Sequence, residues 1–438
     1  MKRFSALLIF ILAAYMVMTC SSSQSAPGKL VPLFDGTSLS GWVNVNCAPE
    51  TWTVREGMIV CSGLPKGVLR TDKMYENYVL ELEWRHTKKG GNAGLFVHAD
   101  DLPATGSAYP RAVEVQIMDG NAGDVFAIKG AFLIPEKRHP GGWTRALPTS
   151  DKMKPTGEWN HYKVVSQDGM VELHVNGDVV TRAFNCNPRK GYICLESEGS
   201  EVHFRNIHIT GLPSSDPVPE AVATRDRGFS NLYTGIDFRG WQWEQGHEGH
   251  WTALDYIIDY DGASEVEDRK RKNLWGEREY GDFELIVDWR LAGEPELKDW
   301  FIILPDGSVA TYENGDSLTA SVLNAGDSGI YLRGSNKCQV NIWNLPVGSG
   351  EVYGYRNNSS MPAEVRRGVT PVINADNPVG EWNRFEIKVV GSVLDVVLNG
   401  KHVIRNAELP GMPATGPIAL QHHGDHLQFC NIYVKELK

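Results

Sequence analysis

The sequence repeats itself, and this internal duplication constrains the fold more than any other feature. Gly-Glu-Trp-Asn occupies residues 157–160 and returns at residues 380–383. Trp-Arg ends an alternating apolar segment at residues 84–85 and again at 289–290. Such pairs follow one another in the same order along both halves, which chance does not explain. We therefore predict two related domains. Four tryptophan pairs stand in register: Trp42/Trp241, Trp52/Trp251, Trp84/Trp289 and Trp159/Trp382.

The domain boundaries follow from length and from a break in periodicity. The 438 residues suffice for two domains of roughly 200 residues each. A proline-rich segment without periodicity, residues 213–228, marks a linker. The first domain is expected at residues 30–212 and the second at residues 229–438. The second copy carries an insertion at residues 292–324, which includes a Pro-Asp-Gly turn signal.

The N-terminus predicts export. A basic start and a short apolar run make residues 1–19 a secretory signal peptide, because the run is shorter than a membrane span. The segment that ends at Cys20 is similar to a bacterial lipobox, so Cys20 is expected to carry the lipid and residues 20–29 to form a tether. Ordinary secretion is the alternative. We expect a lipid-anchored protein of the bacterial cell envelope, periplasmic or surface-exposed, that touches the membrane only through this lipid.

Composition narrows the class of partner. The formal net charge is −11, so the chain lacks the basic footprint of a nucleic-acid-binding protein. The 45 glycines and 13 tryptophans are typical of an all-β protein with many turns. The paired tryptophans are expected in the scaffold, which leaves Trp343 as the one placed in a cleft. The oligomeric state is not predicted.

Six cysteines follow Cys20, and none forms a CxxC pair, which argues against a zinc knuckle. A disulfide between Cys186 and Cys194, one between Cys47 and Cys61, and buried free thiols are all compatible with an exported chain.

Alternation of apolar and polar residues predicts an all-β fold. Residues 79–85, 171–175, 283–290 and 394–398 alternate with a period of two, as half-buried strands do. Asn-Gly, a strong hairpin signal, occurs at residues 176–177 and 399–400. Many short strands with one apolar face indicate two sandwiches of the jelly-roll kind.

The alternation also assigns faces. In the second half, Gln339, Asn341 and Trp343 share the outer face with Tyr331 and Arg333 of a neighbouring segment. In the first half, the corresponding outer face holds Glu114, Gln116, Phe96 and His98. Aromatic rings beside amides and carboxylates suit a sugar-binding cleft. Ordinary solvent-facing side chains are the alternative. The basic run at residues 269–272 is interpreted as a solvated loop, with a contact at the rim of the cleft as the other interpretation.

The duplicated motifs resemble the 3-keto-disaccharide hydrolase domain family, over nearly all of both halves. The resemblance implies two tandem concanavalin-A-like (lectin/glucanase) jelly rolls and hydrolysis of 3-keto-glycosides by exported bacterial proteins. The motifs that carry it lie at residues 33–36 with 41–42, 114–117, 281–285, 328–334, 380–383, and 416–425 with 429–432.

The implied chemistry needs a base, a cation and an acid. A ketone at C3 acidifies the C2 proton; its removal expels the glycosidic oxygen from C1, and water then adds back. In the second domain Arg333 could stabilise the enolate, and His423 or Glu351 could be the base. A substrate-binding role is expected for Tyr331, Gln339, Asn341, Trp343 and Tyr353.

The first domain departs from this pattern, so the two clefts are not expected to do the same job. It has His98 where the second has Arg333, and Glu198 where the second has His423. Glu114 and Glu196 could form the carboxylate pair of a conventional glycosidase. His98, Gln116 and Glu196 are expected to bind substrate.

Three interpretations of function remain. The preferred one is a hydrolase of 3-keto-glycosides whose second domain is catalytic; the others are a non-catalytic carbohydrate-binding lipoprotein and a split between one catalytic and one sugar-binding domain. The partner is an oligosaccharide or a 3-keto-glycoside in each case. The sequence demands no cofactor, although a divalent metal ion that polarises the ketone would suit the chemistry. His422 and His423 are metal-capable, but neighbours on a strand point to opposite faces, so both could bind one ion only if a turn at Gly424 ends the strand; a hydrogen-bonded loop is the alternative.

Overall fold

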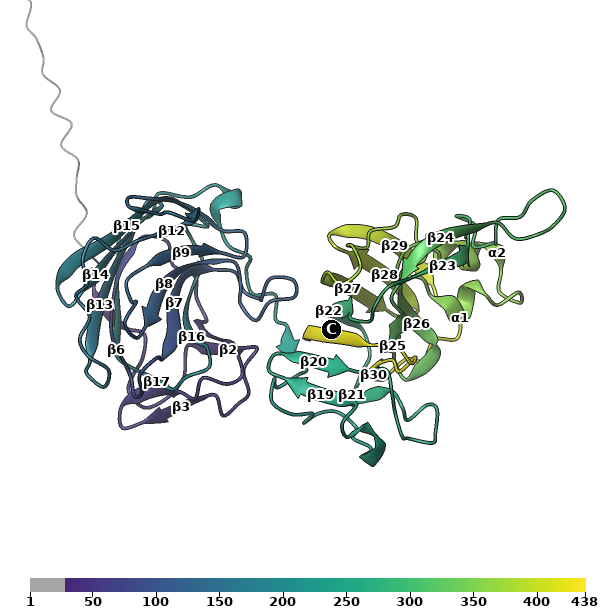
Figure 1. Ribbon diagram of the computed structural model, residues 1–438, viewed down its shortest axis with the longest axis horizontal. Coiled ribbons are helices and arrows are strands. Elements are labelled where there is room, and N and C mark those ends of the chain that lie inside the picture. Colours follow the sequence, from purple (N-terminus) through teal and green to yellow (C-terminus); the bar gives the residue numbers. More distant parts are fainter. Residues whose placement is uncertain (1–27) are drawn as a thin grey trace, which may run out of the picture.

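The computed structural model describes residues 28–438, and these form two β-sandwiches that lie side by side (Figure 1). The signal peptide and Cys20 fall outside the described residues. Among residues 28–438, no helix is long and apolar enough to cross a membrane. The prediction of an all-β chain with two tandem jelly-roll sandwiches is confirmed. The short helices are η1 (Pro219–Ala221), η2 (Gln245–His247), α1 (Tyr353–Arg356) and α2 (Ala363–Gly368).

The first sandwich consists of a nine-stranded back sheet and an eight-stranded front sheet, both antiparallel. The back sheet contains β1 (Leu30–Pro32), β3 (Trp52–Arg55), β4 (Met58–Cys61), β6 (Tyr78–His86), β10 (Phe132–Pro135), β13 (Asn160–Gln167), β14 (Met170–Val175), β15 (Asp178–Asn187) and β17 (Val202–Gly211). The front sheet contains β2 (Trp42–Val45), β5 (Gly67–Thr71), β7 (Asn92–Ala99), β8 (Ala112–Met118), β9 (Val125–Ile128), β11 (Arg138–His139), β12 (Gly142–Ala146) and β16 (Tyr192–Ser197).

The second sandwich has an eight-stranded back sheet, a four-stranded front sheet and a separate two-stranded hairpin. The back sheet contains β18 (Ser230–Asn231), β19 (Trp251–Leu254), β20 (Ile257–Tyr260), β22 (Phe283–Leu291), β27 (Asn383–Val390), β28 (Val393–Leu398), β29 (Lys401–Glu408) and β31 (Leu427–Glu436). The front sheet contains β21 (Leu274–Tyr280), β25 (Asp327–Leu332), β26 (Ser335–Trp343) and β30 (Gly416–Leu420). The hairpin, called the arm below, pairs β23 (Glu296–Phe301) with β24 (Thr319–Asn324) and comes from the predicted insertion.

Each core lies between a front and a back sheet and is built by the alternation seen in the sequence. In β6 every second residue is buried, with Leu80, Leu82 and Trp84 facing inward. Trp289 occupies the same place in the second core and is 1% exposed. Apolar burial of this kind is the main stabilising contribution to such a sandwich. All six cysteines after Cys20 are buried free thiols.

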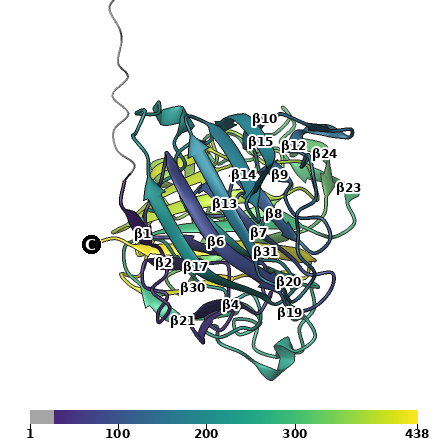
Figure 2. The same cartoon turned by 90° about the vertical axis from the view of Figure 1, so that its left-hand side faces the viewer.

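The two sandwiches are stacked front to back. Figure 2 shows the back sheet of the first sandwich nearest the viewer, with the second sandwich behind it. Phe96 and Tyr192 on the front sheet of the first sandwich pack in one buried cluster with Ile286 and Tyr433 on the back sheet of the second. The second sandwich therefore covers the front sheet of the first, while its own front sheet stays free.

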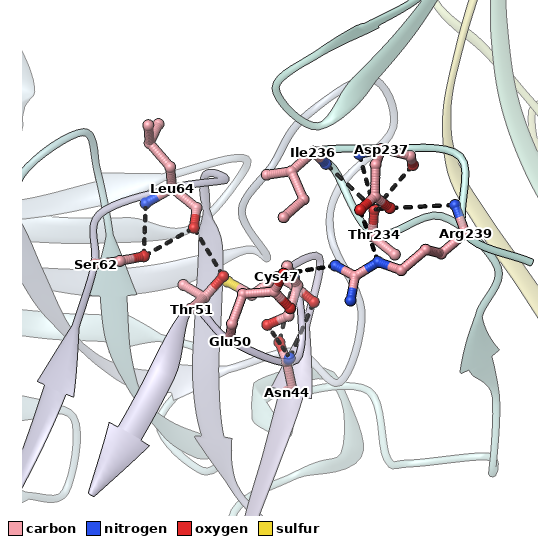
Figure 3. Close-up of polar contacts among 11 residues, drawn as sticks. Asn44, Cys47, Glu50, Thr51, Ser62, Leu64, Thr234, Ile236, Asp237 and Arg239 are labelled. Atoms are coloured by element: carbon pink, nitrogen blue, oxygen red, sulfur yellow. Dashed lines mark hydrogen bonds and ion pairs between the residues drawn. The ribbon is translucent and has the colours of Figure 1, made fainter. Parts of the chain in front are cut away.

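Polar contacts fix this stacking. Asp288 on β22 is fully buried, forms an ion pair with Arg384 and accepts a hydrogen bond from the Asn431 side chain. The Gly106 amide, from a loop of the first sandwich, also donates to Asp288 at 2.8 Å. At the edge of the junction, Arg239 reaches Glu50 of the first sandwich at 2.7 Å (Figure 3).

Candidate functional site

The front sheet of the second sandwich carries a polar cavity of about 770 Å³. This volume falls in the range of small-molecule sites, roughly 300–1,000 Å³. The strands of the sheet supply the floor, and loops and the arm supply the walls. The lining residues are Asp268, Arg269, Lys270, Asn273, Trp300, Asp327, Tyr331, Asn336, Gln339, Asn341, Trp343, Tyr353, Gln421, His422 and His423.

Six residues predicted from sequence line this cavity. Alternation along β26 turns Gln339, Asn341 and Trp343 toward it, because residues two apart on a strand share a face. The others are Tyr331, Tyr353 and His423.

The floor of the cavity is held by amides and a stacked aromatic pair. Gln339 donates to the Gln421 side chain at 2.5 Å, and Gln421 in turn donates to the Tyr331 hydroxyl at 3.0 Å. The Tyr331 ring stacks on Trp275 with 5.7 Å between centroids. These contacts fix the rotamers of the floor, so its polar atoms are preorganised for a ligand.

An acid–base cluster stands at one side of the cavity. The His423 ring lies between two carboxylates: Asp425 is 3.7 Å from Nδ1 and Asp327 is 3.9 Å from Nε2. The Asp425 carboxylate, with help from Asp327, raises the pKa of His423. Burial raises the pKa of Asp327 to about 6, although His423 opposes the shift. A protonated imidazole beside a carboxylate that titrates near neutral pH can act as an acid–base pair.

His422 differs from its neighbour. Burial, reinforced by the nearby Lys272 charge, lowers the pKa of His422 to about 4, so its imidazole is neutral. Its Nδ1 meets the Tyr260 hydroxyl, and its backbone amide donates to Asn273 at 2.9 Å. These contacts fix His422 in the wall of the cavity. Among residues 28–438, no group of three His, Cys, Asp or Glu side chains is close enough to hold a metal ion.

Arg269 and Lys270 lie in the wall of the cavity. Both residues are exposed in a turn, as the solvated-loop interpretation expected, and they also make the contact with the cleft that was its alternative. The Arg269 charge is close enough to oppose protonation of His423. A cation beside the acid–base cluster supplies the charge that an enolate needs.

Arg333 and His98 do not line the clefts in which the sequence placed them. Arg333 stands in the two-residue turn between β25 and β26, where its φ is 48°, so it is not part of the alternating strand. His98 lies in β7 with a φ of 58°, where the register with β16 shifts, and such an irregularity re-aims the side chain and breaks the period of two. A turn and a strand irregularity thus account for the two errors in facing.

The Arg333 side chain is 1% exposed, and its N–H groups donate to structural partners. It donates to the carbonyls of Gly281 and Gly391 and forms an ion pair with Asp282 at 2.8 Å. With these acceptors it ties together loops at the end of the sandwich and leaves no donor directed at the cavity.

His98 is fully buried in the first sandwich. It contacts the Pro188 carbonyl at 3.1 Å and the Ser166 hydroxyl at 2.9 Å. Burial lowers the pKa of His98 to about 4, which keeps it neutral. It is a hydrogen-bonded core histidine rather than a ligand-binding group.

Glu351 does not line the cavity. It is 0% exposed, and its Oε1 is 2.6 Å from Arg356 Nε. The two groups meet as opposite charges without hydrogen-bond geometry. Burial raises the pKa of Glu351 to about 7, against the influence of Arg356. The structure thus separates Glu351 from the ligand space that His423 and Asp327 share.

The acidic residues of the first domain meet, but they are buried beside Tyr109 of the same domain. Burial raises the pKa of Glu114 to about 8. Burial also raises the pKa of Glu196, and the nearby Glu114 carboxyl adds to this shift. Gln116 is 9% exposed, and its side-chain oxygen accepts a hydrogen bond from the Ile117 amide. Tyr109 covers the neighbouring Phe96 edge-on at 5.7 Å. The front sheet of the first sandwich is therefore packed against protein where the sequence predicted a cleft.

Several site residues were missed by sequence reasoning. Asp327 is the clearest case: the duplication aligns it with Asn92, and this change from amide to acid was a usable signal. In the first domain Asn92 donates to Glu198, so the position already faced the polar side of the sheet. The duplication also aligns Gln421 with Glu196 and Asp425 with Ser200, and these replacements were usable signals too. Trp300 lies in the insertion and has no counterpart in the first half.

Known proteins resemble part of the chain. A 3-keto-disaccharide hydrolase from Bacteroides thetaiotaomicron is 26% identical over 227 residues, covering 41% of this chain and 77% of that protein. A candidate glycosyl hydrolase of known structure from Parabacteroides distasonis ATCC 8503 is 25% identical, covers 42% of this chain and 94% of its own, and has a TM-score of 0.34. A Bacillus licheniformis β-glucanase is 13% identical, with coverage of 44% and 100% and a TM-score of 0.30.

The family comparison covers both copies. The 3-keto-alpha-glucoside-1,2-lyase-like domain matches residues 29–210 and again residues 228–435. Together the two matches span most of the chain, so the chain belongs to the 3-keto-alpha-glucoside-1,2-lyase-like domain family and carries that domain twice.

Proposed function

We propose that the chain cleaves 3-keto-glycosides in the cavity of its second domain. The observation that carries this proposal is the placement of His423 between Asp327 and Asp425, in a cavity that Arg269 also lines. The family match and the Bacteroides relative name the same class of substrate.

The residues divide the reaction between them. Asp327, ionised, removes the proton from C2 of the 3-keto sugar, and Arg269 stabilises the enolate oxygen at C3. Collapse of the enolate forms the C1=C2 double bond and expels the glycosidic oxygen, which takes its proton from His423. Water then adds across the double bond, its hydroxyl to C1 and a proton to C2, to give the free 3-keto sugar. The first domain supports the second and performs no step.

The pH profile follows from the two pKa shifts. Asp327 must be ionised, so kcat/KM is expected to rise as pH passes about 6, the pKa of that carboxyl. His423 must be protonated, and the neighbouring carboxylates raise its pKa, so the activity is lost only above that raised value. A bell-shaped profile of kcat/KM for the wild-type protein checks both limbs. A rate that falls as pH rises through 6 contradicts the assignment of Asp327 as base.

Replacement of His423 by Gln is expected to slow cleavage only when the leaving group needs a proton. An alkyl or sugar alkoxide needs the proton, so its release should slow by about 10²-fold or more. A nitrophenolate leaves without protonation and should be released with little loss. Steady-state kinetics on 3-keto-glucosides with the two kinds of leaving group separates these cases, and equal losses on both would count against His423 as the acid.

The general test is release of free sugar from a 3-keto-disaccharide by the purified protein. Binding without turnover would favour a carbohydrate-binding protein instead. The same assay with a chelator tests the need for a divalent metal ion. Activity on the unoxidised disaccharide that Glu114→Gln abolishes would move the chemistry to the first domain.

We also propose that the protein works at the cell envelope as a lipoprotein anchored through Cys20. The basic and apolar leader and the lipobox-like segment before Cys20 support this. In cell fractionation, wild-type protein is expected with membranes and the Cys20→Ala variant is not.

A further inference from the structure

The arm has two unlike faces. On one face Lys298 pairs with Val322 and Trp300 with Ala320; the other carries Leu297 and Phe301. Ala320 and Val322 are partly buried, whereas their neighbours along β24 are exposed. Because Trp300 also lines the cavity, the face that bears it is turned toward the body of the second sandwich.

Trp300 lies farther from the acid–base cluster than the start of β23 does. The arm begins beside the cluster, because Glu296 pairs with Asn324 and the Asp327 amide, three residues later, donates to Asp425 at 2.9 Å. A strand advances about 3.3 Å per residue, so Trp300 lies roughly 13 Å further along the arm. It lines the cavity there and is 38% exposed, which leaves much of its indole ring without a protein partner.

The cavity thus combines a charged end with an aromatic wall away from it. One sugar ring occupies the space among Asp327, His423 and Arg269 when its C2 proton meets the base. The wall contributed by Trp300, with Tyr353 also in the lining, offers an apolar surface for a second ring. Aromatic rings are suited to this contact because a pyranose presents C–H groups on its faces.

We propose that Trp300 is a specificity-determining residue that stacks on the leaving sugar, so that the site is built for disaccharides rather than for glycosides of small alcohols. This inference rests on the proposed function for the identity of the first ring. The arm belongs to the insertion of the second copy, so the first domain has no counterpart of this wall.

The test measures binding as well as turnover, so that the two proposals can fail separately. Binding of a 3-keto-disaccharide and of methyl 3-keto-glucoside is followed by calorimetry with the catalytically disabled Asp327→Asn protein, with and without Trp300→Ala. Loss of the ring contact is expected to weaken disaccharide binding about three- to tenfold and to leave methyl glycoside binding unchanged. Trp300→Phe should restore most of the difference.

Phe301→Ala is the matched control, because Phe301 is the next residue on the same strand, is 48% exposed and points from the opposite face. It should bind both ligands as the parent does. The inference is overturned if Trp300→Ala weakens both ligands equally, if it affects neither, or if the parent prefers neither ligand. Absence of turnover by the protein with native Asp327, with the binding difference intact, would instead contradict only the proposed reaction.

Discussion

Replacing Asp327 with Asn is expected to lower kcat for cleavage of a 3-keto-disaccharide by about 10²- to 10⁴-fold, the usual contribution of a positioned general base. Asn keeps the shape of the side chain but cannot accept the C2 proton. Burial already holds the pKa of Asp327 at about 6, so the native carboxyl is a better base than an exposed one. Steady-state kinetics at a pH above 7 measures the loss.

Glu351→Gln serves as the comparison, since this carboxyl is buried beside Arg356 and does not line the cavity. Its effect should fall on stability rather than on the proton transfer. Full activity of Asp327→Asn, or an equal loss of kcat in Glu351→Gln with an unchanged melting temperature, would assign the base elsewhere.

Replacing Asp288 with Ala is expected to cost about 3–5 kcal/mol of unfolding free energy, because it leaves a charged partner buried without its counterion. Arg384 donates two hydrogen bonds to this carboxylate, at 2.6 and 2.8 Å, and the Asn431 and Gly106 donors converge on it as well. Denaturant unfolding followed by tryptophan fluorescence measures the effect on the second sandwich.

The duplication supplies a matched control for Asp288. Glu83 precedes Trp84 as Asp288 precedes Trp289, and Glu83 accepts from Arg205 and Asn206 in the corresponding way. Its side chain is 25% exposed at the free back of the first sandwich, so Glu83→Ala should cost about 1 kcal/mol or less. Similar costs at the two positions would mean that the stacking of the sandwiches does not bury the Asp288 pair.

The cavity floor was predictable because it depends on local alternation. Tyr331, Gln339, Asn341 and Trp343 all lie where a period of two places them. The same rule failed at Arg333, because the strand ends at Leu332 and Arg333 belongs to the two-residue turn with Gly334, where the period of two no longer applies. Asp327 shares the face of Tyr331 on β25 by the same period of two, so it could have been predicted as well. Arg269 joins the site from a loop, which periodicity does not describe.

The burial of the front sheet of the first domain could not be predicted from the residues of that domain. Glu114, Gln116 and Glu196 occupy the polar side of its front sheet, as the alternation predicted. On the same sheet, Phe96 and Tyr192 pack against Ile286 and Tyr433, which come from a distant part of the chain. An interface between domains depends on the fit of two finished surfaces, so two similar sequences acquire one free front sheet and one covered one.

The central claim is removal of the C2 proton within the second domain, and turnover of a 3-keto-disaccharide in D₂O tests it most directly. The account predicts one deuterium at C2 of the released 3-keto sugar, because water returns a solvent proton to the carbon that lost one. The released sugar, incubated alone for the same time, gives the background exchange. Release of sugar with no deuterium at C2 above that background would show direct displacement at C1 and contradict the account.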